Sequence, residues 1–233
     1  MGNYGHIVSG VKGRLQSLQE NGITHIPMKK SRQAVSKKNH GQPSKGKISK
    51  KEALIHLKQQ VDQCTKCKVL VKNRTNTVFG SGHANAGLMF VGEAPGREED
   101  KQGLPFVGRA GQLLTKMIES IGLTRSQVLI ANVLKCRPPD NRNPMPEEII
   151  NCEPYLLEQL AIIQPKIICA LGAFAAKTLL KTDITISRLR GQFHDYHGIK
   201  LIPTFHPAYL LRNPSEKRKV WEDMKMIKKE LGL

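Results

Sequence analysis

The cysteines are the first residues whose spacing suggests chemistry. Cys64 and Cys67 form a Cys-x2-Cys pair, and Cys136 and Cys152 follow it singly. A lone pair is weak evidence, but two further thiols within reach would complete a site of four thiolates. The spacing lacks the two close pairs of a zinc ribbon, so it suits an iron–sulfur cluster at least as well as zinc. The fifth cysteine, Cys169, lies inside an apolar run and is expected to be a core thiol.

An acidic loop, VGEAPGREED at residues 91–100, is the second place where chemistry is expected. It follows an apolar run, and Gly92 and Gly96 allow the backbone to bend sharply and to approach a ligand closely. A phosphate-binding loop would end in Gly-Lys-Ser/Thr and open a helix, whereas this loop has acids where phosphate would lie. We therefore exclude a nucleotide-binding loop, which leaves a metal site, a catalytic carboxylate or a tight turn.

The elements that must position these residues alternate between short apolar runs and helical patterns. The apolar runs predict strands within 87–93, 127–135, 166–172 and 199–207. Apolar residues at helical spacing predict helices near 53–61, 110–123, 145–165, 173–180 and 215–231. In the third of these helices Pro146 suits the first turn, whereas Pro154 is expected to cause a kink. This alternation predicts an α/β fold with a parallel sheet covered on both faces.

The ends of the predicted strands carry most of the polar candidates. In a parallel sheet, active residues gather beyond the carboxyl ends of the strands. These ends hold Gly92 with Glu93, then Asn132, Gly172 and His206. Three of the four ends present groups with chemistry, so the sequence predicts a functional site at this edge of the sheet.

The charge of the chain points to an anionic partner. The 233 residues carry a formal net charge of +18 and a sequence pI near 9.9, for which nucleic acid is the first candidate. Residues 1–51 hold eleven Lys or Arg and a single acid, Glu20, and supply +10 of this charge. We expect a short helix over residues 5–20 and a flexible basic tail over 28–51. The sequence thus predicts an N-terminal extension at residues 1–50 and an α/β domain at 51–233.

Membrane and secretion signals are not found in the sequence. No apolar stretch reaches the length of about 18 residues that a spanning helix needs. The N-terminal segment MGNYGHIVSG also lacks the charged-then-apolar layout of a signal peptide. We expect an intracellular protein with no membrane partner, in which cysteines serve as metal ligands or core thiols rather than in disulfides.

Three long motifs carry a resemblance to a known family. VGEAPGREEDKQGLPFVGRAGQLL begins at residue 91, ANVLKCRPPDNRNP at 131 and PTFHPAYLLRNP at 203. In this order they resemble the family 4 uracil-DNA glycosylases, the iron–sulfur members of the uracil glycosylase superfamily, over roughly residues 52–231. The resemblance implies a three-layer α/β/α fold with a central four-stranded parallel sheet, and excision of uracil from DNA. It also implies a structural [4Fe-4S] cluster on Cys64, Cys67, Cys136 and Cys152.

The implied reaction gives each residue at the strand ends a role. A uracil turned out of the duplex needs a stacking platform, a reader of the base edge, a stabiliser of the leaving anion and a positioned water. Phe106, in a Gly-Leu-Pro-Phe turn, is the expected platform, and the Asn132 amide matches the O4 and N3 edge of uracil. His206 is expected to donate a hydrogen bond to uracil O2, for which a neutral imidazole suffices. The turn at Gly92 would bring backbone amides near uracil O2 or a phosphate.

The carboxylate that handles the water is left open by the resemblance. Family 1 enzymes carry a water-activating aspartate at the position that is Ala94 here, so Ala94 is expected only among the substrate contacts. Glu93 is the first candidate for positioning the water and stabilising the cationic sugar. Glu99 is the second, or it guards the space near uracil C5 against the methyl group of thymine. Glu98 and Asp100 are expected to be solvated or capping residues.

The segment after His206 resembles the intercalation loop of the superfamily. Leu210, Leu211 and Arg212 are expected to form an exposed leucine pair with an arginine that fills the gap left by the flipped base, with helix core as the alternative for the leucines. No lysine stands where the resemblance marks a Schiff-base nucleophile. We therefore expect a monofunctional glycosylase that acts as a monomer in the cytoplasm, at the nucleoid. The competing hypothesis, which Ala94 keeps open, is a non-catalytic iron–sulfur or zinc protein that binds nucleic acid on the same scaffold.

Overall fold

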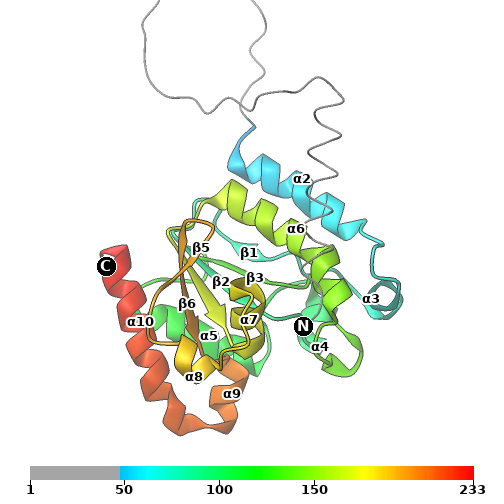
Figure 1. Ribbon diagram of the computed structural model, residues 1–233. Coiled ribbons are helices and arrows are strands. Elements are labelled where there is room, and N and C mark those ends of the chain that lie inside the picture. Colours follow the sequence, from blue (N-terminus) through cyan, green and yellow to red (C-terminus); the bar gives the residue numbers. More distant parts are fainter. Residues whose placement is uncertain (1–47) are drawn as a thin grey trace, which may run out of the picture. The chain divides into compact units, whose positions relative to one another are not determined.

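The computed structural model describes residues 48–233, and Figure 1 shows how their elements are arranged. The helix expected over residues 5–20 lies outside the described residues, as does the predicted basic tail except for its last positions. The first described element is the helix α2 (Lys50–Asp62), which begins with a capping box. Ser49 Oγ accepts from the Glu52 amide at 3.2 Å, and the Glu52 carboxylate accepts from the Ser49 amide at 2.8 Å.

One sheet of six strands forms the centre of the fold, in the order β1-β3-β2-β4-β6-β5. Its strands are β1 (Ser81–Gly82), β2 (Leu88–Gly92), β3 (Leu129–Asn132), β4 (Ile167–Leu171), β5 (His194–Tyr196) and β6 (Ile199–Thr204). The strands β3, β2, β4 and β6 run parallel, whereas β1 and β5 pair antiparallel at the two edges. The predicted α/β fold with four central parallel strands is confirmed, and two short edge strands extend it.

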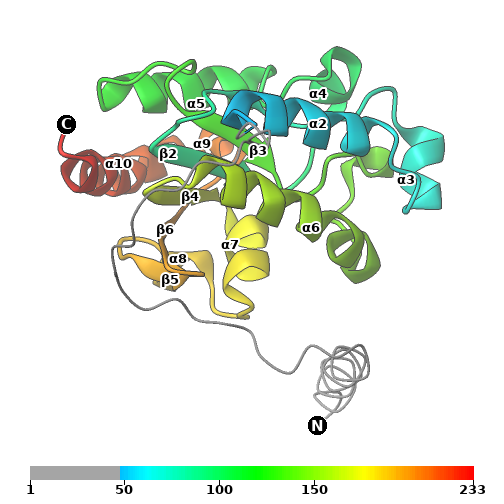
Figure 2. The same cartoon turned by 90° about the horizontal axis from the view of Figure 1, so that it is seen from above.

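Helices cover both faces of this sheet. Besides α2, they are α3 (Lys68–Asn73), α4 (Arg97–Gln102), α5 (Arg109–Ser120), α6 (Pro146–Ile163), α7 (Ala173–Leu180), α8 (Ile186–Leu189), α9 (Pro207–Arg212) and α10 (Lys217–Leu231), with 3-10 turns at Pro139–Asn141 and Pro214–Glu216. Figure 2 shows α5 and α7 on opposite sides of the strands. The order of layers is therefore helix, sheet, helix.

Alternate strand residues feed two separate cores, as the two-residue period of a strand requires. In β2, Leu88 and Phe90 pack with residues of α5, α9 and α10, whereas Met89 and Val91 pack with residues of α6, α7 and α8. Because both faces are covered, β2, β3 and β4 are buried along their whole length. Cys169 lies in β4 and is fully buried, which confirms it as a core thiol.

Helix α6 continues past Pro154 instead of ending there. Pro154 is exposed, so the carbonyl group that loses its helical partner is on the solvent side, where water can bind it. The same helix packs against α2, which contributes Leu57 and Val61 to a small apolar cluster with Phe79. This packing fixes the end of α2, from which the chain leads directly to Cys64.

Candidate active site and cysteine pocket

The carboxyl ends of β2 and β3 bring the first two predicted site residues together. Gly92 and Asn132 are register partners in these parallel strands. A side chain at Gly92 would meet the amide oxygen of Asn132, and its Cβ would lie 2.7 Å from Cζ of Phe106. Only a residue without a side chain leaves room for the amide and the ring at once. We call Gly92, Phe106, Asn132 and His206 the strand-end site.

The side chain of Asn132 is buried but incompletely bonded. Only 1% of the residue is exposed, and its Oδ1 has no hydrogen-bond partner among residues 48–233. A buried acceptor without a partner costs about 1–3 kcal/mol, and the cost is recovered when a donor arrives. The amide is thus set to accept a hydrogen bond from a ligand.

His206 reaches the same site from the end of β6. Its Nδ1 accepts from the Ala208 amide at 3.1 Å, so in the neutral ring the proton is on Nε2, which remains a donor. Burial, with the charge of Arg212 adding to it, lowers the pKa of His206 to about 4, although Glu99 acts in the opposite direction. The ring lies 5.6 Å from that of Phe106, centroid to centroid, at 33°. His206 is therefore a neutral hydrogen-bond donor at physiological pH.

Phe106 is held in an unusual backbone conformation by a carboxylate. Its φ is +53°, in the left-handed region that residues other than glycine rarely adopt. The residue is buried. Glu99 Oε1 accepts from the amides of Val107 at 2.9 Å and Gly108 at 3.2 Å. Arg125 also donates to the carbonyl of Pro105 at 2.9 Å. The two bonds from Glu99 fix the turn that carries the Phe106 ring.

The other residues of the acidic loop have different surroundings. Burial is the one effect that shifts the Glu93 carboxyl, and it raises the pKa. The methyl group of Ala94 packs instead on the small apolar cluster of Leu70, Leu134, Cys136 and Cys152. Asp100 is buried and accepts from the amides of Thr75 and Asn76, and exposed Glu98 pairs with Lys101. The solvated role expected for Glu98 is confirmed. The expectation for Asp100 is wrong, because this buried carboxylate binds the loop after α3 and caps no helix.

The predicted intercalation segment is only partly exposed. Residues 207–212 form α9, and its helical period turns Pro207 and Leu210 inward. Leu210 is 1% exposed and belongs to the core with α5 and α10, so the expectation of an exposed leucine pair is wrong for this residue. Leu211 is 38% exposed and Arg212 is exposed as well. One leucine and one arginine are therefore free to meet a ligand.

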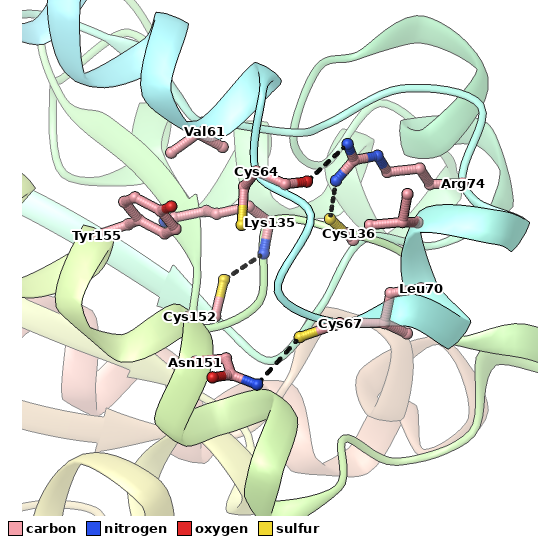
Figure 3. Close-up of a pocket in the computed structure, with 11 residues that line it drawn as sticks. Val61, Cys64, Cys67, Leu70, Arg74, Lys135, Cys136, Asn151, Cys152 and Tyr155 are labelled. Atoms are coloured by element: carbon pink, nitrogen blue, oxygen red, sulfur yellow. Dashed lines mark hydrogen bonds between the residues drawn. The ribbon is translucent and has the colours of Figure 1, made fainter.

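The four predicted ligand cysteines line one pocket, which Figure 3 shows. Cys64 and Cys67 come from the segment between α2 and α3, Cys136 from the loop after β3, and Cys152 from α6. All four are free thiols; the first two are half-buried and the last two are buried. We call this site the cysteine pocket. It joins three segments that are distant in sequence.

Nitrogen donors surround the sulfur atoms of the cysteine pocket. The amide of Lys135 donates to Cys152 Sγ at 3.2 Å, Arg74 Nη1 to Cys136 Sγ at 3.1 Å, and Asn151 Nδ2 to Cys67 Sγ at 3.7 Å. Such donors favour thiolates. Burial opposes them and raises the pKa of Cys67 and Cys136, and that of Cys152 to about 11. A bound cation would reverse this balance, so the donor set fits a metal–sulfur group.

The four cysteines lie around a common space rather than around a single point. Within residues 48–233, no three His, Cys, Asp or Glu side chains converge closely enough to hold a single ion. Yet all four cysteines face the same pocket, whose wall is completed by apolar groups such as Val61 and Leu70 and by Tyr155. Four sulfur ligands around one pocket are the donor set of a zinc ion or of an iron–sulfur cluster.

Several residues of both sites were not predicted from the sequence. Arg74 and Asn151 lie outside the recognised motifs, and nothing in their spacing marks them as donors to sulfur. Lys135 belongs to a recognised motif, but its spacing does not predict that its side chain is fully buried. Glu99 lies in the first turn of α4, eight and nine residues before the amides that it binds at the start of α5. The sequence does not predict these bonds, because an acid so far from a helix start has many possible partners.

A comparison with protein families shows to which family the chain belongs. Residues 79–225 match the family model described as the uracil DNA glycosylase superfamily. The chain belongs to this superfamily.

Curated members of the superfamily match most of the chain. The Type-4 uracil-DNA glycosylase of Thermotoga maritima is 47% identical over 184 residues, which cover 77% of this chain and 95% of that protein. The Type-4 uracil-DNA glycosylase of Archaeoglobus fulgidus is 46% identical over 184 residues, or 76% of this chain and 92% of that protein. A Type-5 uracil-DNA glycosylase of Pyrobaculum aerophilum is 32% identical over 146 residues, or 55% of this chain and 64% of that protein. In the described part of this superfamily member, no helix is long and apolar enough to cross a membrane.

Proposed function

We propose that this chain is a DNA repair glycosylase that turns uracil out of DNA and hydrolyses its N-glycosidic bond. The observation that carries the proposal is the buried, unpartnered Oδ1 of Asn132, which lies beside the Phe106 ring. The Nε2 donor of His206 belongs to the same site. An acceptor, an aromatic face and a neutral donor are the three groups that hold a flipped pyrimidine. The Type-4 relatives bear the name of this activity.

Base selection follows from the Asn132 amide. Uracil presents the N3–H donor and the O4 acceptor side by side, so Oδ1 accepts from N3 while Nδ2 donates to O4. Cytosine presents an unprotonated N3 and an N4 donor, and the same amide would face two mismatched groups. A site built to hydrogen-bond one edge rejects an analogue that lacks it, because buried polar groups are then left unpaired.

Bond cleavage leaves positive charge on the sugar and negative charge on the uracil. His206 donates from Nε2 to uracil O2, and it does so as a neutral ring because its pKa is about 4. Glu93 positions the attacking water and stabilises the cationic sugar, since within residues 48–233 no hydrogen bond engages its carboxylate, whereas Glu99 binds the Phe106 turn. Glu99 acts through the Phe106 turn. Backbone amides at Gly92 and Ala94 complete the contacts to the base.

The surface of α9 and the charge of the chain supply the DNA contacts. Leu211 and Arg212 meet the gap in the duplex, and Leu210 supports them from the core. No lysine stands at a Schiff-base position, so the product is an uncut abasic site. An enzyme of this kind needs no second subunit at the site, and we propose a monomer that works on chromosomal DNA in the cytoplasm, at the nucleoid.

We also propose that Cys64, Cys67, Cys136 and Cys152 hold a [4Fe-4S] cluster. The four thiols around one pocket and the nitrogen donors to three of them support this proposal, and zinc is the alternative. When bound, such a cluster contributes folding free energy by tying together the segment after α2, the loop after β3 and α6. A broad absorbance near about 400 nm would support the cluster, and a colourless protein that holds zinc would contradict it.

The activity is tested with an oligonucleotide that carries a single uracil. The folded protein is incubated with this DNA, which is then treated with alkali to break the strand at abasic sites. We expect strand cleavage with uracil opposite guanine, opposite adenine and in single strands, and none with a thymine control. Absence of cleavage above a blank, with uracil-selective binding retained, would instead support the non-catalytic nucleic-acid-binding protein.

A further inference from the structure

Lys135 has a fully buried side chain that ends at the backbone of Asn132. The residue is 1% exposed, and its ammonium Nζ donates to the main-chain carbonyl of Asn132 at 2.8 Å. A second bond runs from Nζ to Gln159 Oε1 at 2.7 Å. Gln159 is itself oriented by a bond from its Nε2 to the carbonyl of Phe79 at 2.9 Å. The ammonium is thus held in place from α6 while it binds the end of β3.

The backbone of the same residue belongs to the cysteine pocket. The Lys135 amide donates to Cys152 Sγ at 3.2 Å, and the next residue in the chain is Cys136. Figure 3 shows the bond from the Lys135 amide to the sulfur atom of Cys152. One residue therefore contacts a predicted cluster ligand with its amide and the predicted uracil reader with its side chain.

Burying an ammonium is costly, and packing does not explain it. Within residues 48–233, none of the ion pairs involves Lys135. The neighbours that can carry negative charge are the sulfur atoms of Cys136 and Cys152, which would be thiolates only with a metal group bound. Methionine has a similar length and would fill the same space without the desolvation cost. The bonds to the Asn132 carbonyl and to Gln159 are what only the ammonium provides.

We propose that Lys135 is a positioning residue for base recognition, which fixes Asn132 against the strand-end site and connects it to the cysteine pocket. The proposal rests on the proposed uracil glycosylase function. Asn132 ends β3, and the amide of the next residue, Val133, still donates to the Gly92 carbonyl at 2.9 Å. The ammonium adds a restraint on the other side of the same peptide by binding the Asn132 carbonyl. A displaced peptide would turn the Asn132 amide away from the uracil edge, and misplacement by about 1 Å can cost roughly 100-fold in rate.

The test is Lys135→Met in the full-length, cluster-loaded protein. Binding is measured by fluorescence anisotropy on DNA that carries a non-cleavable 2′-fluoro-deoxyuridine and on matched DNA with 2′-fluoro-deoxycytidine at that place. We expect the ratio of the two affinities to fall by roughly 10-fold to 100-fold. The absorbance near about 400 nm should be kept. In a cycle with Asn132→Ala, the double variant should be no worse than Asn132→Ala alone, because both changes remove the same recognition.

The matched control is Arg190→Met, which replaces a partly buried cation with a thioether in the network around Asp223. It should lower stability and keep the ratio of affinities. Gln159→Met is the second variant, which removes an acceptor from the ammonium but leaves the lysine in place; it should shift the ratio in the same direction by a smaller factor. This variant decides the question if Lys135→Met does not fold or loses its absorbance.

The outcomes separate this inference from the proposed function. Wild-type selectivity and turnover in Lys135→Met, or in a folded Gln159→Met when the first variant fails, would overturn the positioning role. Selective binding of uracil DNA without cleavage by the wild type, with loss of this selectivity in Lys135→Met, would support the positioning role and contradict the proposed glycosylase activity. A wild-type protein without uracil selectivity would remove both.

Discussion

Gly92 and Asn132 end adjacent parallel strands as register partners, and the amide oxygen of Asn132 occupies the space that a side chain at Gly92 would fill. The Phe106 ring borders the same space. The glycine is therefore the condition under which the amide and the ring approach each other. The recognition site therefore requires a residue without a side chain at position 92.

Gly92→Ala tests this relationship. The added methyl displaces the Asn132 amide and the Phe106 ring, because its Cβ would lie 2.7 Å from Cζ of Phe106. We expect kcat/KM on uracil DNA to fall by about 100-fold. Overpacking should also lower the free energy of unfolding by about 1–3 kcal/mol, as measured by denaturant titration.

Gly87→Ala is the matched control for that variant. Gly87 precedes the same strand at its other end, and a Cβ there meets only Leu231 Cδ2, at 3.8 Å. Turnover and stability should stay close to the wild type. Equal losses in the two variants would mean that β2 tolerates no added methyl, and the specific role of Gly92 would be contradicted.

His206→Ala should separate turnover from binding. Loss of one donor to the developing anion lowers kcat by about 100-fold to 1,000-fold. The affinity for uracil DNA with a non-cleavable sugar should change little, because most of that affinity comes from phosphate contacts and stacking. Single-turnover kinetics and anisotropy measure the two quantities, and equal losses in both would contradict a role in the transition state.

The pH dependence of stability should report the low pKa of His206. The folded pKa of about 4 lies below the unfolded value of about 6.5, so the unfolded chain takes up the proton first as the pH falls. The contribution of the neutral His206 to the free energy of unfolding is fully present above about pH 6.5 and is lost as the pH falls from about 6.5 to about 4. At pH 5 the free energy of unfolding should be lower by about 1–2 kcal/mol. Denaturant titrations at pH 7 and pH 5 should show this difference in the wild type and not in His206→Asn.

The sequence contained enough to predict the frame of the site. The apolar runs that end at Gly92 and Asn132 form parallel strands that are buried on both faces. Such strands are predictable because they are apolar throughout, whereas a surface strand alternates apolar and polar residues. The position of the site then follows from strand polarity. The edge strands were missed because β1 has two residues and β5 three, too few to produce a pattern.

Individual contacts were less predictable than the frame. The inward turn of Leu210 depends on where α9 begins, and one residue of shift would have exposed it. Glu99 and Lys135 have partners that tertiary packing selects: backbone amides eight and nine residues away, and a glutamine on α6. Residue type and spacing do not encode these choices, because each polar group could be satisfied in several ways.

The two glutamates of the acidic loop should differ in what they lose. Glu99→Ala removes both bonds to the Phe106 turn and should lower the free energy of unfolding by about 0.5–2 kcal/mol, together with turnover. Glu93→Gln should lower kcat by about 100-fold without loss of stability, because burial already disfavours the charged carboxylate. Denaturant titration and single-turnover kinetics distinguish them. A wild-type kcat in Glu93→Gln would mean that another group positions the water.

Two cysteine variants should separate the cysteine pocket from the core. Cys152→Ser removes a pocket sulfur and should abolish most of the absorbance near about 400 nm and lower stability, since cluster binding is coupled to folding. Cys169→Ala changes a thiol buried within β4 and should keep the absorbance. Iron and sulfide analysis of both proteins measures the same difference. Full absorbance in Cys152→Ser would remove this residue from the ligand set.

Neighbouring leucines of α9 should have opposite phenotypes because the helix turns them to opposite sides. Leu211 is 38% exposed, so Leu211→Ala should change the free energy of unfolding by less than about 0.5 kcal/mol. It should nevertheless slow uracil excision from duplex DNA more than from single strands, because only the duplex leaves a gap for the side chain to fill. Leu210 is 1% exposed in the core, so Leu210→Ala should cost about 2–5 kcal/mol and affect both substrates equally. A Leu211→Ala enzyme that slows equally on both substrates would contradict insertion into the duplex.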